Sequence, residues 1–310
     1  MKYIKYINDQ FRNAVGRSNS IVLYGQNISA GSCISGLTKG INGNASCLVI
    51  NTPNIENTQV GIGFGLMLNG VSSVFFMKQQ DFLLLGVDHL VNTYNFVRID
   101  KPLASFTIVT VVVDSGYEGI QSCLNNFSDF CSIARIPGYA VTNKHDADQI
   151  IGTYLISPGF RIIGISQRLF QTELIVCEDA VSAYNSGEIF QYYSGKDATI
   201  VCFNFSLPQG LKLYNEFVSR GLHASLFSVN AVLPVDWGII IEDVNRTRKL
   251  IVLDDSKSVN CSCYHLTTTI YRECNPERLK IFRRELTDDV LRPNSDEFIV
   301  DVDILMQQLK

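Results

Sequence analysis

The chain has 310 residues and a formal net charge of −4 at pH 7, with 46% hydrophobic and 18% charged residues. This length predicts about two domains, and the composition is too apolar for a disordered chain. The negative balance argues against nucleic acid as the main partner, because neutralising phosphates requires clustered Lys and Arg. The apolar content indicates a large core or a large interface with another subunit.

Neither an export signal nor a membrane span is visible. Residues 1–10 alternate charges with aromatics and lack the apolar stretch of a signal peptide. The longest apolar stretch, 60–77, is interrupted by Asn69-Gly70 and Ser72-Ser73, which predicts a helix, a turn and a strand. We therefore expect a cytoplasmic protein with no membrane partner, whose nine cysteines stay reduced.

Short apolar runs alternate with helical stretches along the chain. The predicted strands are 21–24, 47–50, 71–77, 106–114, 162–166, 199–205, 224–229 and 249–254. The predicted helices are 58–68, 82–96, 146–156 and 211–220. Most strands are unbroken runs of Val, Ile, Phe and Leu, which is typical of strands buried on both faces of a parallel sheet. The predicted fold class is α/β, with mainly parallel sheets flanked by helices.

A domain boundary is predicted within residues 178–196. There the regular apolar pattern gives way to Ser, Gly and Tyr, and a new strand–helix–strand pattern begins at Thr199. The expected domains are therefore 1–185 and 186–310.

Several short motifs follow one another in a fixed order. They are Tyr24 to Ile28, Asn51 to Asn57, Val60-Gly61 with Gly63 and Gly65, Asp81-Phe82, Asp88 with Asn92, Ile136-Pro137-Gly138, Gln167 to Phe170, and Gly195 to Val201. In this order they resemble the beta subunit of the pyruvate and branched-chain 2-oxoacid dehydrogenase first components. The C-terminal half of transketolase is similar but matches less well.

The resemblance implies a pyrimidine-binding domain for thiamine diphosphate, followed by a transketolase C-terminal-like domain. It implies a beta-type subunit that activates this cofactor for attack on a 2-oxo acid or ketose, with transfer of an acyl or ketol unit. The acceptor, lipoamide or an aldehyde, stays open. In that family the Glu at the position of Glu56 contacts N1′ of the aminopyrimidine, so Glu56 is the expected catalytic residue. Phe76, Gln79 and Phe82 are expected to line the pyrimidine pocket.

The family's diphosphate anchor, a Gly-Asp-Gly motif that also holds Mg²⁺, is absent from this sequence. The resemblance therefore implies an alpha-type partner subunit that holds the diphosphate and Mg²⁺. A heterotetramer, active only as a complex, is expected. No metal ligands are expected in this chain itself, because Cys261-x-Cys263 lacks a second Cys/His pair at ligand spacing.

Some features depart from the family pattern or have a simpler explanation. Gln79 replaces an aromatic residue, and the loop 115–127 has no His where the family has a catalytic one; Tyr117, Glu118, Gln121 or Asn125 are its polar candidates. His89 is expected to be a packing or surface residue, and His145, His223 and His265 have no partner at catalytic spacing.

Alternatives follow from these features. Taken alone, Glu56 is also consistent with an acid that stabilises a helix N-terminus. The glycines Gly61, Gly63 and Gly65 are expected to let their helix approach a neighbouring chain or the cofactor. The alternative function is a non-catalytic structural or regulatory subunit that retains the fold.

Overall fold

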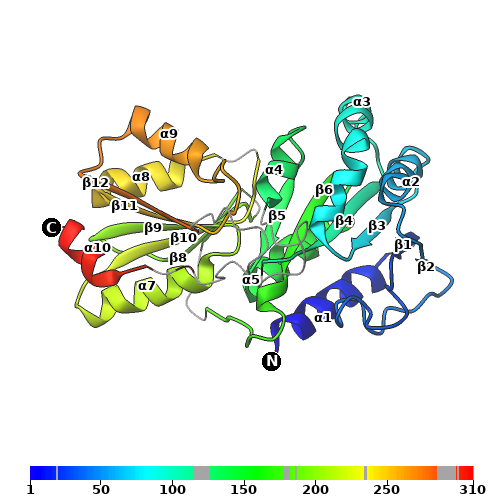
Figure 1. Cartoon of the computed structure of the whole chain (residues 1–310), viewed down its shortest axis with the longest axis horizontal. Helices are drawn as coiled ribbons and strands as arrows, with labels where there is room; N and C mark the ends of the chain where they lie inside the picture. The colour runs from blue at the N-terminus through cyan, green and yellow to red at the C-terminus, as the bar shows by residue number, and fades with distance from the viewer. Residues whose placement is uncertain are drawn as a thin grey trace, which may run out of the picture. The chain divides into compact units, whose positions relative to one another are not determined.

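The computed structural model describes residues 1–18, 20–114, 126–177, 182–185, 187–233, 236–284, 298 and 300–309. The chain divides into two compact units (Figure 1). The first unit comprises Met1–Ser115 and Asp129–Val176, and the second comprises Gly116–Ser128 and Cys177–Lys310.

The first unit is built on a six-stranded sheet whose paired strands are all parallel, in the order β2-β1-β3-β4-β6-β5. Its strands are β1 (Ile21–Gly25), β2 (Cys47–Asn51), β3 (Ser73–Met77), β4 (Ser105–Val112), β5 (Gly138–Val141) and β6 (Gly159–Ser166). Every residue of β3 and β4 is buried, as their unbroken apolar runs predict for a sheet covered on both faces.

Two helices cover opposite faces of this sheet. Helix α1 (Tyr3–Gly16) places Phe11 against Phe76 of β3, with ring centroids 5.4 Å apart. Helix α2 (Glu56–Leu68) places Phe64 edge-on against Phe106 of β4 at 5.1 Å. Phe75 directly precedes Phe76 in β3. It points to the α2 face of the sheet, because consecutive strand residues alternate between faces.

The remaining helical segments of this part of the chain are short. They are η1 (Gln80–Gly86), η2 (His89–Thr93), α3 (Tyr94–Val97), α4 (Phe127–Ser132), α5 (Lys144–Asp146), η3 (Ala147–Ile151), α6 (Gly152–Tyr154) and η4 (Gln167–Leu169). The helices predicted over 82–96 and 146–156 are thus each a succession of differently wound segments: 3₁₀, π and α in the first, and α, π and α in the second. Apolar spacing does not distinguish these windings, because they differ in hydrogen-bond partner and little in side-chain pattern.

The second unit has its own six-stranded sheet, in the order β12-β11-β9-β10-β8-β7. Its strands are β7 (Ser182–Tyr184), β8 (Ile189–Tyr193), β9 (Ala198–Phe203), β10 (Ala224–Val229), β11 (Lys249–Asp254) and β12 (Arg278–Arg283). The four strands from β12 to β10 are parallel, and β8 pairs antiparallel with β10 and with β7. The predicted fold class, α/β with mainly parallel sheets, is confirmed.

Among the described residues, four helices accompany this second sheet: α7 (Leu207–Ser219), α8 (Gly238–Thr247), α9 (Tyr264–Glu273) and α10 (Val302–Leu309). Ile240 of α8 and Leu266 of α9 join Val201, Phe227 and Val252 of three strands in one buried cluster. Nowhere in the described ranges is a helix both long and apolar enough to cross a membrane.

Candidate functional site

Most of the predicted site residues follow strands of the first unit at one edge of its sheet. Glu56 begins α2 shortly after β2, while Gln79 and Phe82 follow β3. Strands β2 and β3 are both hydrogen-bonded to β1, parallel to it. The sheet therefore brings these segments to its carboxyl-terminal edge, where ligands bind in open α/β sheets.

The side chain of Glu56 is mostly buried, and its carboxylate has no partner in the described part of the chain. Its relative exposure is 9%, and within the described part of the chain it makes neither an ion pair nor a hydrogen bond. Its position in the first turn of α2 places it near the positive end of the helix dipole. Burying a charged group without a partner is costly, so this carboxyl group is suited to meet a ligand.

The loop before Glu56 is fixed to α2 by the side chain of Gln59. Its amide nitrogen donates to the hydroxyl of Thr52 and, over 3.0 Å, to the carbonyl oxygen of Pro53. The hydroxyl of Tyr24 in turn donates to the carbonyl oxygen of Gln59 at 2.8 Å. The Thr52-Pro53 motif thus supports the start of the helix that carries Glu56.

The segment after β3 packs on the same helix. A Cβ atom added at Gly86 would lie 2.7 Å from Cγ2 of Val60 and 3.6 Å from the carbonyl oxygen of Glu56. Gly86 therefore lets η1 lie directly against the first turns of α2.

Phe76 lies on the face of the sheet that α1 covers, opposite the α2 face. Its ring packs against Phe11 of α1, whereas Phe75 stacks on Tyr24 at 5.2 Å on the α2 face. Gln79 and Phe82 are both partly buried at the edge. The structure thus brings Gln79 and Phe82 to the edge where Glu56 lies and leaves Phe76 in the core beneath α1.

Gln80 is a site candidate that the motifs did not single out. Its side chain is fully buried, and neither its amide oxygen nor its amide nitrogen has a hydrogen-bond partner in the described part of the chain. Buried amides are nearly always satisfied, and an exception requires an explanation such as an absent ligand. The sequence feature that could have indicated Gln80 as a site candidate is its position between Gln79 and Asp81, two residues of the motifs discussed above.

A buried ion pair occupies the next part of this edge. Asp114 follows β4 and accepts hydrogen bonds from the hydroxyl of Ser166 at 2.6 Å and from the backbone nitrogen of Arg168 at 3.0 Å. The guanidinium group of Arg168 lies 3.6 Å from the same carboxylate. This pair joins the ends of β4 and β6, and sequence motifs alone did not pair the two residues. The candidates Tyr117, Glu118, Gln121 and Asn125 lie outside the described residues.

The glycines of α2 serve the chain's own packing. A Cβ atom at Gly63 would lie 2.2 Å from the ring of Phe106, and one at Gly61 would lie 2.8 Å from Nε2 of His89. The expectation that these two glycines face another chain or the cofactor was therefore wrong, because their own sheet and η2 fill that space. A Cβ atom added at Gly65 would meet none of the described residues within 4 Å.

The histidines make structural contacts. Nδ1 of His89 lies 2.8 Å from the hydroxyl of Thr93, which agrees with the packing role predicted for it. The indole nitrogen of Trp237 donates to Nδ1 of His265 at 2.7 Å. The backbone nitrogens of His145 and His223 donate to the side chains of Asn143 and Asp197.

No protein-family model matches the chain. It is 21% identical over 215 residues to the pyruvate dehydrogenase E1 component subunit beta of Rhizobium meliloti, which covers 67% of this chain and 46% of that protein. It is 21% identical over 269 residues to the acetoin:2,6-dichlorophenolindophenol oxidoreductase subunit beta of Cupriavidus necator, covering 81% and 78% of the two chains. A mitochondrial pyruvate dehydrogenase E1 beta-1 subunit of Arabidopsis thaliana is also 21% identical, over 73% of this chain and 64% of its own length.

Among solved structures, the chain is similar to a protein described as a split gene transketolase, inactive beta4 tetramer. The TM-score is 0.73 with 12% sequence identity, over 98% of this chain and 97% of the other. The fold is therefore that of this transketolase chain. The sequence relatives and the structural neighbour point to one type of chain, the beta subunit or transketolase C-terminal type, and the resemblance predicted from the motifs is confirmed.

Proposed function

We propose that this chain is the beta-type subunit of a two-component thiamine diphosphate-dependent enzyme. In this proposal residues 1–185 form the pyrimidine-binding domain and 186–310 form the transketolase C-terminal-like domain. The observation that carries it is the mostly buried side chain of Glu56, whose carboxyl group has no partner among the described residues, at the carboxyl-terminal edge of a parallel sheet. The chain is also similar to subunits named as beta components of such enzymes.

The residues at this edge fit the pyrimidine half of the cofactor. Glu56 offers an acid that would share a proton with N1′, and the buried amide of Gln80 offers a donor and an acceptor that the described protein leaves unused. Thiamine diphosphate itself supplies the nucleophilic carbon that attacks a 2-oxo acid or ketose. The protein's part is to hold the ring, exclude water and keep the proton on the Glu56–N1′ pair.

A partner chain completes the proposed site. The sequence contains no Gly-Asp-Gly motif, so an alpha-type subunit would hold the diphosphate and Mg²⁺, which prefers carboxylate and phosphate oxygens. We propose a cytoplasmic heterotetramer. The structural neighbour, described as an inactive tetramer of beta chains, supports a need for the second component.

Calorimetric titration tests the proposal. Thiamine diphosphate with Mg²⁺ is titrated into the chain alone and into the chain co-expressed with a partner that carries Gly-Asp-Gly. We expect binding by the complex and none by the chain alone. Absence of binding in every assembly would refute the proposal.

Substitutions of Glu56 distinguish an active subunit from a non-catalytic one. In the assembled complex, Glu56→Gln and Glu56→Ala should each lower turnover of a 2-oxo acid or ketose by about 10²-fold or more, as loss of a proton-transfer group does. Glu242→Gln, at an exposed position on α8, is the matched control and should leave turnover unchanged. Full turnover with Glu56→Ala would support the structural or regulatory alternative instead.

A further inference from the structure

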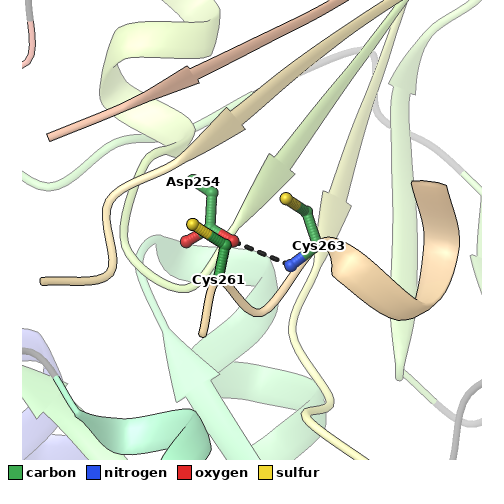
Figure 2. Close-up of side chains that lie close together, drawn as sticks. All are labelled: Asp254, Cys261 and Cys263. Carbon is green, nitrogen blue, oxygen red and sulfur yellow. Dashed lines mark hydrogen bonds between the residues drawn. The ribbon is translucent and has the colours of Figure 1, made fainter. Parts of the chain in front are cut away.

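The second unit contains a buried cluster of two thiols and a carboxylate. Asp254 ends β11, and the following loop brings Cys261 and Cys263 back beside it just before α9 (Figure 2). Ligand atoms from the three residues all lie within 4.8 Å of one another. The exposed fractions are 0%, 5% and 0%, in that order.

The carboxylate of Asp254 is held in a fixed orientation without any cation. It accepts hydrogen bonds from the backbone nitrogen of Cys263 at 2.8 Å and of Ser256 at 3.0 Å, and from the Ser256 hydroxyl at 2.5 Å. The amide of Asn204 lies 3.4 Å away. Within the described residues Asp254 forms no ion pair. Buried charges in proteins are usually paired or bound to a metal, and outer hydrogen bonds of this kind orient metal ligands.

The surroundings favour negative charge on the sulfur of Cys261 and disfavour it on that of Cys263. Cys263 is the N-cap residue of α9, yet its interaction with Cys261, its burial and the charge of Asp254 raise the pKa of its thiol. The hydroxyl of Tyr264 lies near the thiol of Cys261, and the guanidinium group of Arg283 donates to that hydroxyl at 3.3 Å. Two thiolates, one carboxylate and a divalent ion leave a net charge of −1, which Arg283 partly balances.

We propose that Asp254, Cys261 and Cys263 bind one Zn²⁺ ion per chain. Thiolate sulfur selects a borderline-soft ion such as Zn²⁺ over Mg²⁺ or Ca²⁺, which take oxygen ligands. Binding would deprotonate both thiols and release two protons. Three protein ligands leave the fourth tetrahedral position for water. The ion would tie the loop between β11 and α9 to the end of its strand.

Metal titration of the reduced full-length chain tests this site. The chain is stripped with a chelator, kept in a thiol-free reductant and titrated with Zn²⁺ and, separately, with Co²⁺. We expect one equivalent of Zn²⁺ to bind and to raise the melting temperature. The Co²⁺ complex should show sulfur-to-metal charge-transfer absorption and the intense visible bands of a tetrahedral ion.

Matched variants locate the ion. Cys261→Ser and Cys263→Ser should abolish the charge-transfer band, and Asp254→Asn should weaken Zn²⁺ affinity at least 10-fold, as loss of a ligand or its hydrogen-bonded support does. Cys274→Ser changes a partly exposed thiol of the same unit and should bind Zn²⁺ normally. Failure of the unmodified chain to bind Zn²⁺, a Co²⁺ spectrum without thiolate bands, or full binding by the double Cys→Ser variant would overturn the proposal. The Co²⁺ spectrum keeps the test decisive if a variant does not fold.

Discussion

The hydroxyl group of Tyr24 donates a 2.8 Å hydrogen bond to the carbonyl oxygen of Gln59, joining the end of β1 to the helix that begins with Glu56. Burial raises the pKa of Tyr24 far above its ordinary value, so the hydroxyl stays protonated and able to donate. This contact makes the orientation of α2 depend on the sheet.

Removing that hydroxyl should loosen α2. For Tyr24→Phe we expect the free energy of unfolding to fall by about 1–2 kcal/mol, the typical cost of a lost buried hydrogen bond. Urea denaturation of the isolated chain measures it. The control is Tyr271→Phe, whose ring is 86% exposed. An equal effect at both positions would show that the contact with Gln59 contributes nothing.

The buried amide of Gln80 should destabilise the isolated chain and contribute to binding of thiamine diphosphate in the assembled complex. Gln80→Met keeps the length of the side chain and removes its two partnerless polar atoms, so we expect the isolated chain to become more stable by about 1–2 kcal/mol. The same variant should weaken thiamine diphosphate binding by the assembled complex. Gln59→Met, which removes an amide with partners, should instead destabilise the chain. A loss of stability in Gln80→Met would contradict the idea of an unused amide.

Two glycines of α2 should respond in opposite directions to alanine. At Gly63 the added methyl group would meet the ring of Phe106, so Gly63→Ala should cost about 1–3 kcal/mol through overpacking. At Gly65 there is open space in this chain, and Gly65→Ala should stabilise the helix by roughly 0.5–1 kcal/mol. Thermal or chemical unfolding of the two variants compares them directly. Stabilisation by Gly63→Ala would show that α2 does not approach β4 closely, and destabilisation by Gly65→Ala would contradict the open space at that position.

The carboxyl group of Glu188 should make stability depend on pH. Partial burial, and secondarily the charge of Asp236, raise the pKa of Glu188 in the folded chain. Its ionised form therefore costs stability at neutral pH, and this cost disappears as the pH falls through the folded pKa. Because the group is half-exposed, we expect Glu188→Gln to gain only about 0.5 kcal/mol at pH 7.

The difference in free energy of unfolding between Glu188→Gln and the unmodified chain, measured against pH, shows whether the Glu188 charge is the cause. Chemical denaturation of both proteins at a series of pH values should give a gain at pH 7 that vanishes below about pH 4, where the carboxyl group is protonated in the folded and unfolded states. Glu242→Gln, at an exposed position, should show no such profile. A gain for Glu188→Gln that does not change with pH would point to packing instead of charge.

The sequence predicted the central strands well and the edges of the second sheet poorly. The runs 224–229 and 249–254 have the observed bounds of β10 and β11, because completely buried strands are continuous apolar runs. Strands β7 and β8 lie where Ser, Gly and Tyr were interpreted as a domain boundary. Helix α1 was not predicted at all, although its apolar residues recur with helical spacing.

The site residues divide in a similar way. Glu56 was predicted from the family resemblance, which rests in part on the short motif that includes Thr52, Pro53 and Glu56. The orphaned amide of Gln80 and the position of Asp254 beside two cysteines were not predicted. Burial and hydrogen-bond satisfaction depend on which strands are neighbours, and a single sequence does not give that order. The pairing of Asp114 with Arg168 across the ends of β4 and β6 was also not predicted, because it requires β4 and β6 to be neighbours.

Strand β12 lies at one edge of the second sheet among the described strands. Among the described strands it pairs with β11 alone, so its outer row of backbone groups is a template on which a foreign strand could grow. Its sequence, Arg278-Leu-Lys-Ile-Phe-Arg283, carries cations along its length. A second copy docking along this edge would bring cation against cation, and charges of this kind on an edge strand disfavour edge-to-edge pairing.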